Sequence, residues 1–261
     1  MDLTILVSSC DKFQDCWEPF ILAFNNCWPD CPFPKYIITN YDGWDGDRNG
    51  FKCIQVGHDE GWSTNMKTAI DKVGLSSSYI LYLQEDYWLT THIDSDFIIS
   101  QIDYCKKKDL DYLRLTFPWM DSYQIDNIHA ISPIGKEQYA ICLLAAIWKR
   151  SSLYKLLVPG WSGWDFEANV ETLDLSGFKA EVLLEKEARK QFHFIDAVRR
   201  GRWTRIGLNY LRKNNFNHLI NKREKEGIVY TSIVDAMRLN KVFRIIGSRI
   251  IRIMHSQKWY F

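Results

Sequence analysis

Two neighbouring carboxylates, Glu85 and Asp86, directly follow an apolar run that spans residues 79–83. The run reads YILYL, which is typical of a buried strand, and Tyr87 and Trp88 come immediately after the acids. Acids at the end of a buried strand are suited to a divalent ion that holds phosphate groups. They could also cap the next element of the chain, but the flanking aromatic residues favour a functional site.

A second group of acids lies in the segment PGWSGWDFEANVE, residues 159–171. Trp161 and Trp164 bracket a Ser-Gly pair, and Asp165 and Glu167 follow. Indole rings stack on the apolar CH faces of sugars, while carboxylates exchange protons with hydroxyl groups. The segment is therefore a candidate sugar-binding site, with an ordinary helix cap beside core tryptophans as the alternative.

The elements that must position these residues alternate between strand and helix in the first half of the chain. Apolar runs predict strands at residues 3–10, 35–40, 51–56 and 79–83, and amphipathic stretches predict helices at residues 14–26 and 61–73. This alternation indicates βαβ units and a mostly parallel sheet. Farther on, a strand is expected at residues 111–119, and residues 138–157 should pass from strand into helix. The irregular segment 120–138 between them is long enough to be a binding loop.

Polar side chains follow several of the predicted strands. They are Ser8, Ser9, Asp11, Asn40, Asp42, Glu85 and Asp86. In open α/β sheets, ligands bind at the carboxyl ends of the strands. These residues should therefore meet at one edge of the sheet and form a ligand crevice, although Asp11 or Asp42 taken alone reads more simply as a helix cap.

Composition and cysteine usage bound the class of protein. The chain has 261 residues, of which 46% are hydrophobic and 25% are charged, as in a globular protein with a sizeable core. Its seven cysteines are irregularly spaced, and the N-terminus lacks the basic start and cleavage site of a secretion signal. We therefore expect reduced thiols and a cytoplasmic location. No run of 18 apolar residues suggests a membrane span.

Charge is distributed unevenly along the chain. Residues 189–261 hold 17 Lys and Arg against 4 Asp and Glu, whereas residues 1–188 hold 16 against 28. The segment 232–261 has apolar residues at helical spacing with basic residues between them, and it ends in Trp259, Tyr260 and Phe261. This pattern predicts a basic amphipathic helix that binds a membrane surface, with docking onto the rest of the protein as the alternative.

The order of these parts resembles the GT-A class of nucleotide-sugar glycosyltransferases, of the type that builds bacterial surface polysaccharides. The resemblance covers about residues 3–200 and consists of VSSCD, LQEDYW, GWSGWDFE and the later FHFIDAVRRGRW. It implies a Rossmann-type, mostly parallel sheet flanked by helices, as catalytic domain 1–205, followed by a helical basic extension, 206–261.

The resemblance also implies roles for the candidate residues. Asp86 and His193 would bind a divalent metal, Mn²⁺ or Mg²⁺, and Glu167 or Asp165 would be the catalytic base. Contacts to the nucleotide sugar would come from Ser8, Ser9, Asp11, Asn40, Asp42, Ser63, Asn65, Lys67 and Glu85. Acceptor contacts would come from Trp161, Trp164 and Trp119. The chain has Gln84-Glu85-Asp86 where the class commonly has Asp-X-Asp, so a cationic side chain such as Lys67 is the alternative means of neutralising the diphosphate.

The basic tail and the resemblance together suggest a lipid-linked oligosaccharide acceptor in capsule or O-antigen synthesis, and a peripheral position at the inner face of the cell membrane. A glycoside hydrolase would use paired carboxylates beside tryptophans as well. A non-catalytic sugar-binding module is the other alternative. Nucleic acid is not an expected partner, because the first half is acidic and no nucleic-acid-binding motif is present.

Overall fold

The computed structural model describes residues 2–73, 77–116, 141–183 and 190–227. The chain divides into two compact units, Met1–Phe194 and Ile195–Phe261. This boundary lies before the functional division expected after residue 205, which stays a prediction.

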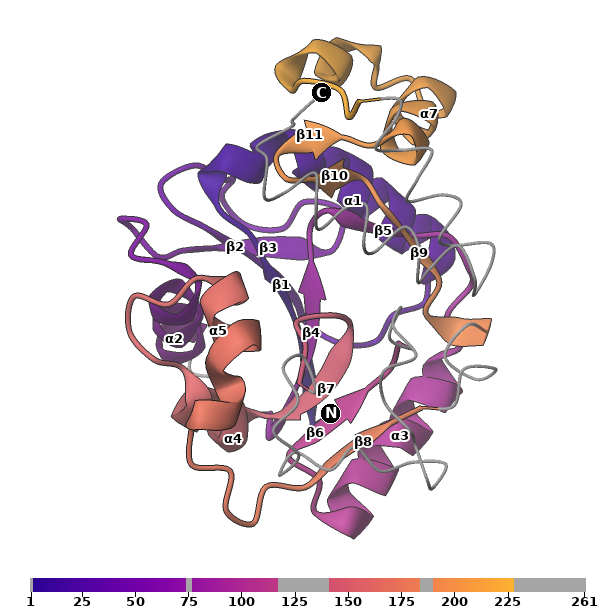
Figure 1. The fold of residues 1–261 in the computed structure, drawn as a ribbon. Helices are drawn as coiled ribbons and strands as arrows, with labels where there is room; N and C mark the ends of the chain where they lie inside the picture. Colours follow the sequence, from indigo (N-terminus) through magenta and orange to yellow (C-terminus); the bar gives the residue numbers. More distant parts are fainter. Residues whose placement is uncertain (1, 74–76, 117–140, 184–189, 228–261) are drawn as a thin grey trace, which may run out of the picture. The chain divides into compact units, whose positions relative to one another are not determined.

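The first unit is built on a seven-stranded sheet with strand order β3-β2-β1-β4-β7-β6-β8 (Figure 1). The strands are β1 (Leu3–Ser8), β2 (Lys35–Thr39), β3 (Phe51–Gln55), β4 (Tyr79–Gln84), β6 (Tyr112–Arg114), β7 (Ala146–Lys149) and β8 (Ala180–Val182). The strands β3, β2, β1 and β4 run parallel, and β7 is antiparallel to its neighbours β4 and β6. The mostly parallel α/β sheet expected from the sequence is confirmed.

The strand register aligns the ends of the central strands. All six residues of β1 are buried, as expected for a parallel strand covered on both faces. Ser8 lies opposite Gln84, so the carboxyl ends of β1 and β4 are level and Glu85 projects just beyond them. In the middle of the sheet, Tyr82 pairs with Ala146, which in turn pairs with Arg114.

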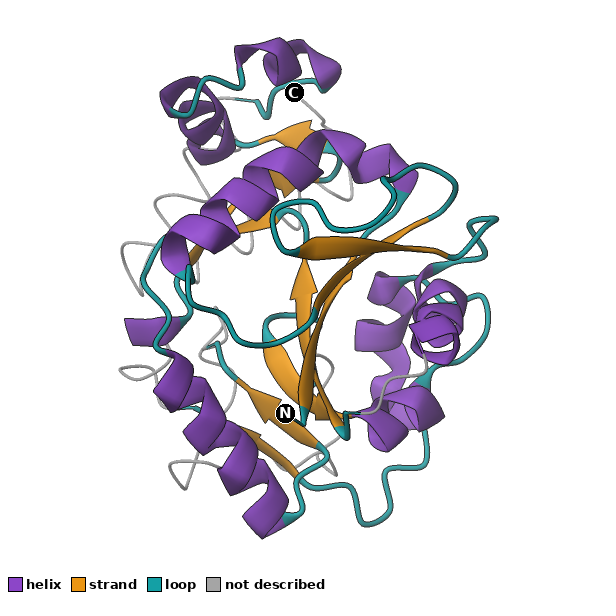
Figure 2. Ribbon diagram, turned by 180° about the vertical axis from the view of Figure 1, so that it is seen from behind, coloured by secondary structure: helices purple, strands orange, loops and turns teal. Residues whose placement is uncertain are grey.

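Helices cover both faces of this sheet. They are α1 (Gln14–Cys27), α2 (Trp62–Val73), α3 (Ser95–Lys108), α4 (Arg150–Leu156) and α5 (Gly163–Asn169), with short 3-10 segments η1 (Asp11–Phe13) and η2 (Val170–Thr172). Figures 1 and 2 show α2, α4 and α5 on one face and α1 and α3 on the other. The short strand β5 (Tyr87–Leu89) follows β4 directly. The helices predicted at residues 14–26 and 61–73 are confirmed as α1 and α2.

Large aromatic side chains fill the layer between the sheet and the helices α2, α4 and α5. Trp148 of β7 is fully buried, and its ring centroid lies 4.5 Å from that of Tyr112 and 6.3 Å from that of Phe166. Trp62 packs on Phe166 at 5.0 Å. Several tryptophans therefore have core roles, and they fix α5 to the first turn of α2.

The second unit contains a short hairpin and a capped helix. Its elements are β10 (Val198–Arg199), β11 (Arg202–Trp203), α7 (Arg205–Lys213) and η3 (Asn217–Lys222), and β9 (Phe194–Asp196) spans the boundary between the units. Arg200 and Gly201 both have positive φ at the hairpin turn, as a type I′ turn requires. The predicted membrane-binding segment 232–261 lies outside the described residues. None of the helices within the described ranges has the length and apolar character needed to cross a membrane.

Candidate functional site

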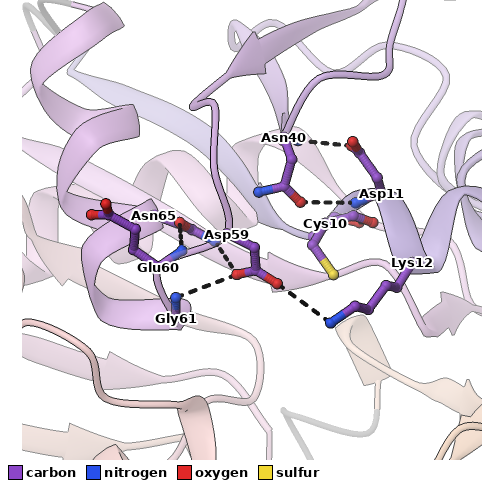
Figure 3. Close-up of polar contacts among 9 residues, drawn as sticks. Cys10, Asp11, Lys12, Asn40, Asp59, Glu60, Gly61 and Asn65 are labelled. Atoms are coloured by element: carbon purple, nitrogen blue, oxygen red, sulfur yellow. Dashed lines mark hydrogen bonds and ion pairs between the residues drawn. The ribbon is translucent and has the colours of Figure 1, made fainter.

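Asp11 and Asn40 join the carboxyl ends of β1 and β2 (Figure 3). The backbone amide of Asn40 donates to Asp11 Oδ1 at 2.8 Å, and the backbone amide of Asp11 donates to Asn40 Oδ1 at 3.1 Å. The amides of Tyr41 and Asp42 donate to the other carboxylate oxygen at 2.8 and 3.1 Å. One carboxylate thus fixes three consecutive amides of the loop after β2, while the side chain of Asp42 stays exposed.

The side-chain amide nitrogen of Asn40 is a buried hydrogen-bond donor. Asn40 is 6% exposed, and its Nδ2 has no hydrogen-bond partner within the described part of the chain. Because Oδ1 accepts from Asp11, Nδ2 points away from Asp11 in Figure 3. A buried donor left unsatisfied costs about 1–3 kcal/mol, so a ligand acceptor placed here would be bound favourably.

Asp59 organises the loop between β3 and α2 at the same edge. Its Oδ1 accepts from Asn65 Nδ2 at 2.9 Å and from the Gly61 amide at 3.3 Å, and its Oδ2 lies 3.8 Å from Lys12 Nζ. Asn65 Oδ1 in turn accepts from the Glu60 amide at 3.3 Å. Asn65 is among the residues predicted from the sequence, whereas Asp59 and Lys12 are not, although Asp59 also follows a predicted strand.

Close backbone packing connects the start of α2 to the Trp161 segment. Gly61 has φ of +91°, and a Cβ there would lie 2.9 Å from the carbonyl oxygen of Gly160. The Ser63 amide donates to the carbonyl oxygen of Trp161 at 2.9 Å. Ser63 is fully buried in this contact, so it supports the loop that carries Trp161.

The end of β4 places Glu85 beside the end of β1. Glu85 is 6% exposed, and its carbonyl oxygen accepts from Trp88 Nε1 at 3.0 Å. Burial raises the pKa of the Cys10 thiol to about 11, and the negative charge of Glu85 adds to this rise. Asp86 is half-buried in the turn between β4 and β5. Both acids therefore lie at the predicted sheet edge.

His193 is held at the opposite end of β5 from Asp86. Its Nδ1 lies 2.6 Å from Thr90 Oγ1, and its carbonyl oxygen accepts from the Thr90 amide at 2.9 Å. The described ranges contain no group of three or more His, Cys, Asp or Glu side chains that could hold a metal ion. A single carboxylate such as Asp86 still fits an ion of the Mg²⁺ type that takes its other ligands from substrate phosphates and water.

Two further predicted residues that would contact the nucleotide sugar have local structural partners. Ser9 Oγ accepts from Trp17 Nε1 at 2.7 Å and so anchors α1. Lys67 lies in the middle of α2 with its ammonium group 4.7 Å from the ring centroid of Tyr154 in α4. These contacts place Lys67 on the side of α2 that faces α4.

The two candidate bases at α5 have different surroundings. Asp165 forms a capping box with Ser162: its Oδ2 accepts from the Ser162 amide at 2.9 Å and from Ser162 Oγ at 2.6 Å. These hydrogen bonds lower the pKa of Asp165. Asp165 therefore begins the helix, which was the alternative interpretation of this segment.

Glu167 is half-buried and points back towards the sheet. Its Oε1 accepts from the Leu143 amide at 2.6 Å. Burial raises the pKa of Glu167, while the Leu143 amide and the positive charge of Arg114 offset part of that rise. A carboxylate with a raised pKa is a stronger proton acceptor than an exposed one, so Glu167 suits general base catalysis better than Asp165 does.

The predicted acceptor-binding tryptophans differ in exposure. Trp164 is 74% exposed on α5, which leaves its ring face open for stacking. Trp161 is half-buried beside α2. Trp119 lies outside the described residues.

Comparison with known proteins shows similarity of fold without similarity of sequence. No protein-family model matches the chain, and no curated protein matches it. S. aureus TarS, residues 1–349, is similar with a TM-score of 0.49 at 11% identity, over 94% of this chain and 72% of that one. The same TarS fragment in complex with UDP-GlcNAc gives a TM-score of 0.47 at 12% identity, over 94% and 73%.

The mannosyltransferase PcManGT from Pyrobaculum calidifontis, in complex with GDP-Man and Mn²⁺, is similar with a TM-score of 0.51 at 12% identity. This match covers 77% of the present chain and 58% of the other. At such low identity the similarity concerns the fold and not the reaction. The resemblance expected from the sequence is thus confirmed at the level of architecture: the chain has a GT-A fold.

Proposed function

We propose that this protein is a glycosyltransferase that moves a sugar from a nucleotide sugar to a hydroxyl group of a saccharide acceptor. The observation that carries the proposal is the buried, unsatisfied Nδ2 of Asn40 at the carboxyl edge of a GT-A sheet. Ligands of open α/β sheets bind at this edge. The nucleotide sugar named with PcManGT supports the same class of substrate.

The nucleotide would bind over the loops that Asp11 and Asp59 hold in place. Asn40 Nδ2 would donate a hydrogen bond to it, and Ser8 and Asn65 lie at neighbouring strand and helix ends. Asp11 acts indirectly, because its carboxylate is already occupied by backbone amides. Glu85 is buried behind this surface and shapes it.

Departure of the nucleoside diphosphate requires neutralisation of its charge. A divalent ion bound together with the diphosphate would supply that charge, and Asp86 is the residue proposed to hold it. His193 is the second proposed ligand, and Lys67 is the alternative cation. Asp86 has the stronger case, because it lies in the turn directly beyond β4.

Glu167 is proposed to accept the proton of the attacking acceptor hydroxyl. The acceptor oxygen would form a bond to the anomeric carbon as the bond from that carbon to the phosphate oxygen breaks, with the electron pair leaving on the diphosphate. Trp164 would stack on the acceptor sugar beside this position. This arrangement corresponds to inversion at the anomeric centre.

A thermal-shift screen of nucleotides and nucleotide sugars, each with and without Mn²⁺ or Mg²⁺, tests the proposal. A ligand that binds the folded state at 100 times its Kd stabilises it by about 2.7 kcal/mol. Stabilisation that needs metal and is lost in Asp86→Ala would support the ion, and loss in His193→Ala would add the second ligand. Stabilisation without metal that is lost in Lys67→Met would favour the cationic alternative.

Turnover of the stabilising nucleotide sugar with a saccharide panel then tests transfer itself. No thermal shift with any nucleotide, together with hydrolysis of an aryl glycoside, would favour the glycoside hydrolase. Binding of the nucleotide sugar without turnover on any acceptor would favour the sugar-binding module.

The acceptor is further proposed to be a lipid-linked oligosaccharide of capsule or O-antigen type, reached by a protein bound at the inner face of the cell membrane. This part rests on the sequence of residues 232–261, since Lys and Arg near an anionic surface each contribute about 1 kcal/mol. Substitution of Arg244, Arg249 and Arg252 by Gln should weaken sedimentation with anionic phospholipid vesicles by about tenfold or more. Equal binding by the triple variant would contradict membrane association through this segment.

A further inference from the structure

A buried guanidinium lies at the end of β6, on the sheet face that carries α5. Arg114 is 2% exposed, and its Nη1 donates to Cys142 Sγ at 3.0 Å. It is two residues beyond Tyr112, so both side chains project from the same face of the sheet. A buried cation is costly unless its charge is paired or hydrogen-bonded.

The same side chains fix the backbone that contacts Glu167. The Tyr112 hydroxyl donates to the carbonyl oxygen of Cys142 at 3.1 Å and accepts from the Cys142 amide at 3.4 Å. The next residue, Leu143, donates its amide to Glu167 Oε1 at 2.6 Å. Cys142 therefore connects Arg114 and Tyr112 to the carboxylate of α5 through one residue of main chain.

Arg114 is also the charged side chain, among the described residues, that acts on the Glu167 carboxylate. Its positive charge lowers the pKa of Glu167 against the larger effect of burial. Within the described ranges, Tyr112 and Cys142 are the other titratable side chains in this set of contacts, and burial raises the pKa of Tyr112 well above its usual range. Asp165, on the same helix, is exposed and is bound to Ser162.

We propose that Arg114, held by the Cys142 thiol, is a positioning residue that keeps the Glu167 carboxylate ionised and oriented towards the acceptor. The inference rests on the proposed role of Glu167 as the base. The electrostatic effect of Arg114 on Glu167 is independent of the reaction, so it can be measured without turnover.

The first test is a titration of glutamate side chains labelled with ¹³C at the carboxyl carbon, followed by NMR in the full-length protein. Glu167→Gln identifies the resonance of Glu167 by its loss. In Arg114→Met, the midpoint of this resonance should move upward by about half a pH unit or more, whereas Arg114→Lys should stay near the wild type. An unchanged midpoint in a folded Arg114→Met protein would overturn the proposal.

If Arg114→Met does not fold, two variants of Cys142 test the same proposal. Cys142→Ser retains an acceptor for the guanidinium, so the titration midpoint of Glu167 in this variant should equal that of the wild type. Cys142→Ala removes the acceptor and should shift the Glu167 midpoint in the same direction as Arg114→Met. Equal Glu167 midpoints in these two variants would show that the Cys142 thiol does not hold Arg114 where its charge acts on Glu167.

Activity then separates this inference from the proposed function. In Arg114→Met, the acidic limb of the kcat/KM profile should move to higher pH along with the NMR midpoint, and Arg114→Lys should restore it. If the wild type transfers no sugar from any nucleotide sugar, the proposed function fails while the NMR result still decides the electrostatic coupling. If transfer occurs and Arg114→Met has a wild-type pH profile, the positioning role fails alone.

Discussion

Asp11 and Asn40 hold each other by reciprocal hydrogen bonds, each through its backbone amide and its side-chain oxygen. The pair fixes the loops after β1 and β2 at the edge where ligands of such sheets bind. It also leaves Asn40 Nδ2 as a buried donor aimed away from the pair. The structural task of Asp11 and the proposed binding task of Asn40 can therefore be separated experimentally.

Replacement of Asp11 by Ala should lower the free energy of unfolding by about 1–3 kcal/mol, because three backbone amides lose their acceptor. Asp11→Asn keeps one carbonyl oxygen as an acceptor, so its free energy of unfolding should fall by less than that of Asp11→Ala. Urea unfolding measures both. The matched control is Asp42→Ala. Because the Asp42 side chain is exposed, its removal should change the free energy of unfolding by no more than about 0.5 kcal/mol. Equal stability of Asp11→Ala and the control would contradict a stabilising role for the hydrogen bonds to the Asp11 carboxylate.

Replacement of Asn40 by Asp retains the oxygen that accepts from the Asp11 amide and removes the Nδ2 donor. We expect the Kd of the stabilising nucleotide to rise by about tenfold or more, since one lost hydrogen bond from a buried group is worth 1 kcal/mol or above, on the order of a factor of ten. Calorimetric titration measures the change, and Asn40→Ala controls for the added charge. Unchanged affinity in both variants would place the nucleotide elsewhere.

Glu167→Gln should lower kcat by about 10²–10⁴-fold, the usual contribution of a general base. The amide still offers an oxygen to Leu143, so folding and the thermal shift with the nucleotide sugar should be preserved. Asp165→Asn is the matched control on the same helix. It disturbs the capping box and should reduce stability by about 0.5–2 kcal/mol, with a much smaller loss of kcat. The reverse pattern in the two variants would assign the base to Asp165.

The stability of the wild type relative to Glu167→Gln should depend on pH. Because the pKa of Glu167 is raised in the folded state, this state binds the proton more tightly than the unfolded chain does. The favourable contribution is complete below the ordinary glutamate pKa and is lost as pH rises through the folded-state pKa. Chemical unfolding at a series of pH values should therefore show that, as pH rises, the free energy of unfolding of the wild type falls relative to that of the variant. A constant difference would mean that Glu167 titrates normally.

Local sequence patterns predicted the central sheet well, because continuous apolar runs such as residues 79–83 have few alternatives in a chain of this kind. The helix α3 was not anticipated, although Asp94 as its N-cap and Ile98 and Ile102 at helical spacing were available signals. The gathering of Asp11 and Asn40 also followed from strand order. These features depend on residues that lie near each other in the sequence or at equivalent strand ends.

Features set by tertiary contacts could not be predicted in the same way. Burial raises the pKa of Glu167, and the amide of Leu143, 24 residues away, partly offsets that rise. The position of His193 depends on Thr90, which is 103 residues away. Asp59 lies in a loop whose course no periodic pattern specifies, and its partner Lys12 lies in η1, far from it in the sequence. The capping box of Asp165 was indicated in the sequence by Ser162 three residues earlier. The tryptophans on either side favoured a sugar-binding site, and the helix cap was the alternative.

The approach of Gly61 to Gly160 has a mechanical consequence. Two main chains in direct contact, with no side chain between them, cannot separate by a change of rotamer, and the packing of Trp62 on Phe166 reinforces the contact. The loop that carries Asp59 and the helix that carries Glu167 should therefore move as one block. The spacing between the Asp59 loop and the Glu167 carboxylate should therefore vary little with thermal motion, because direct contact between the two main chains limits it.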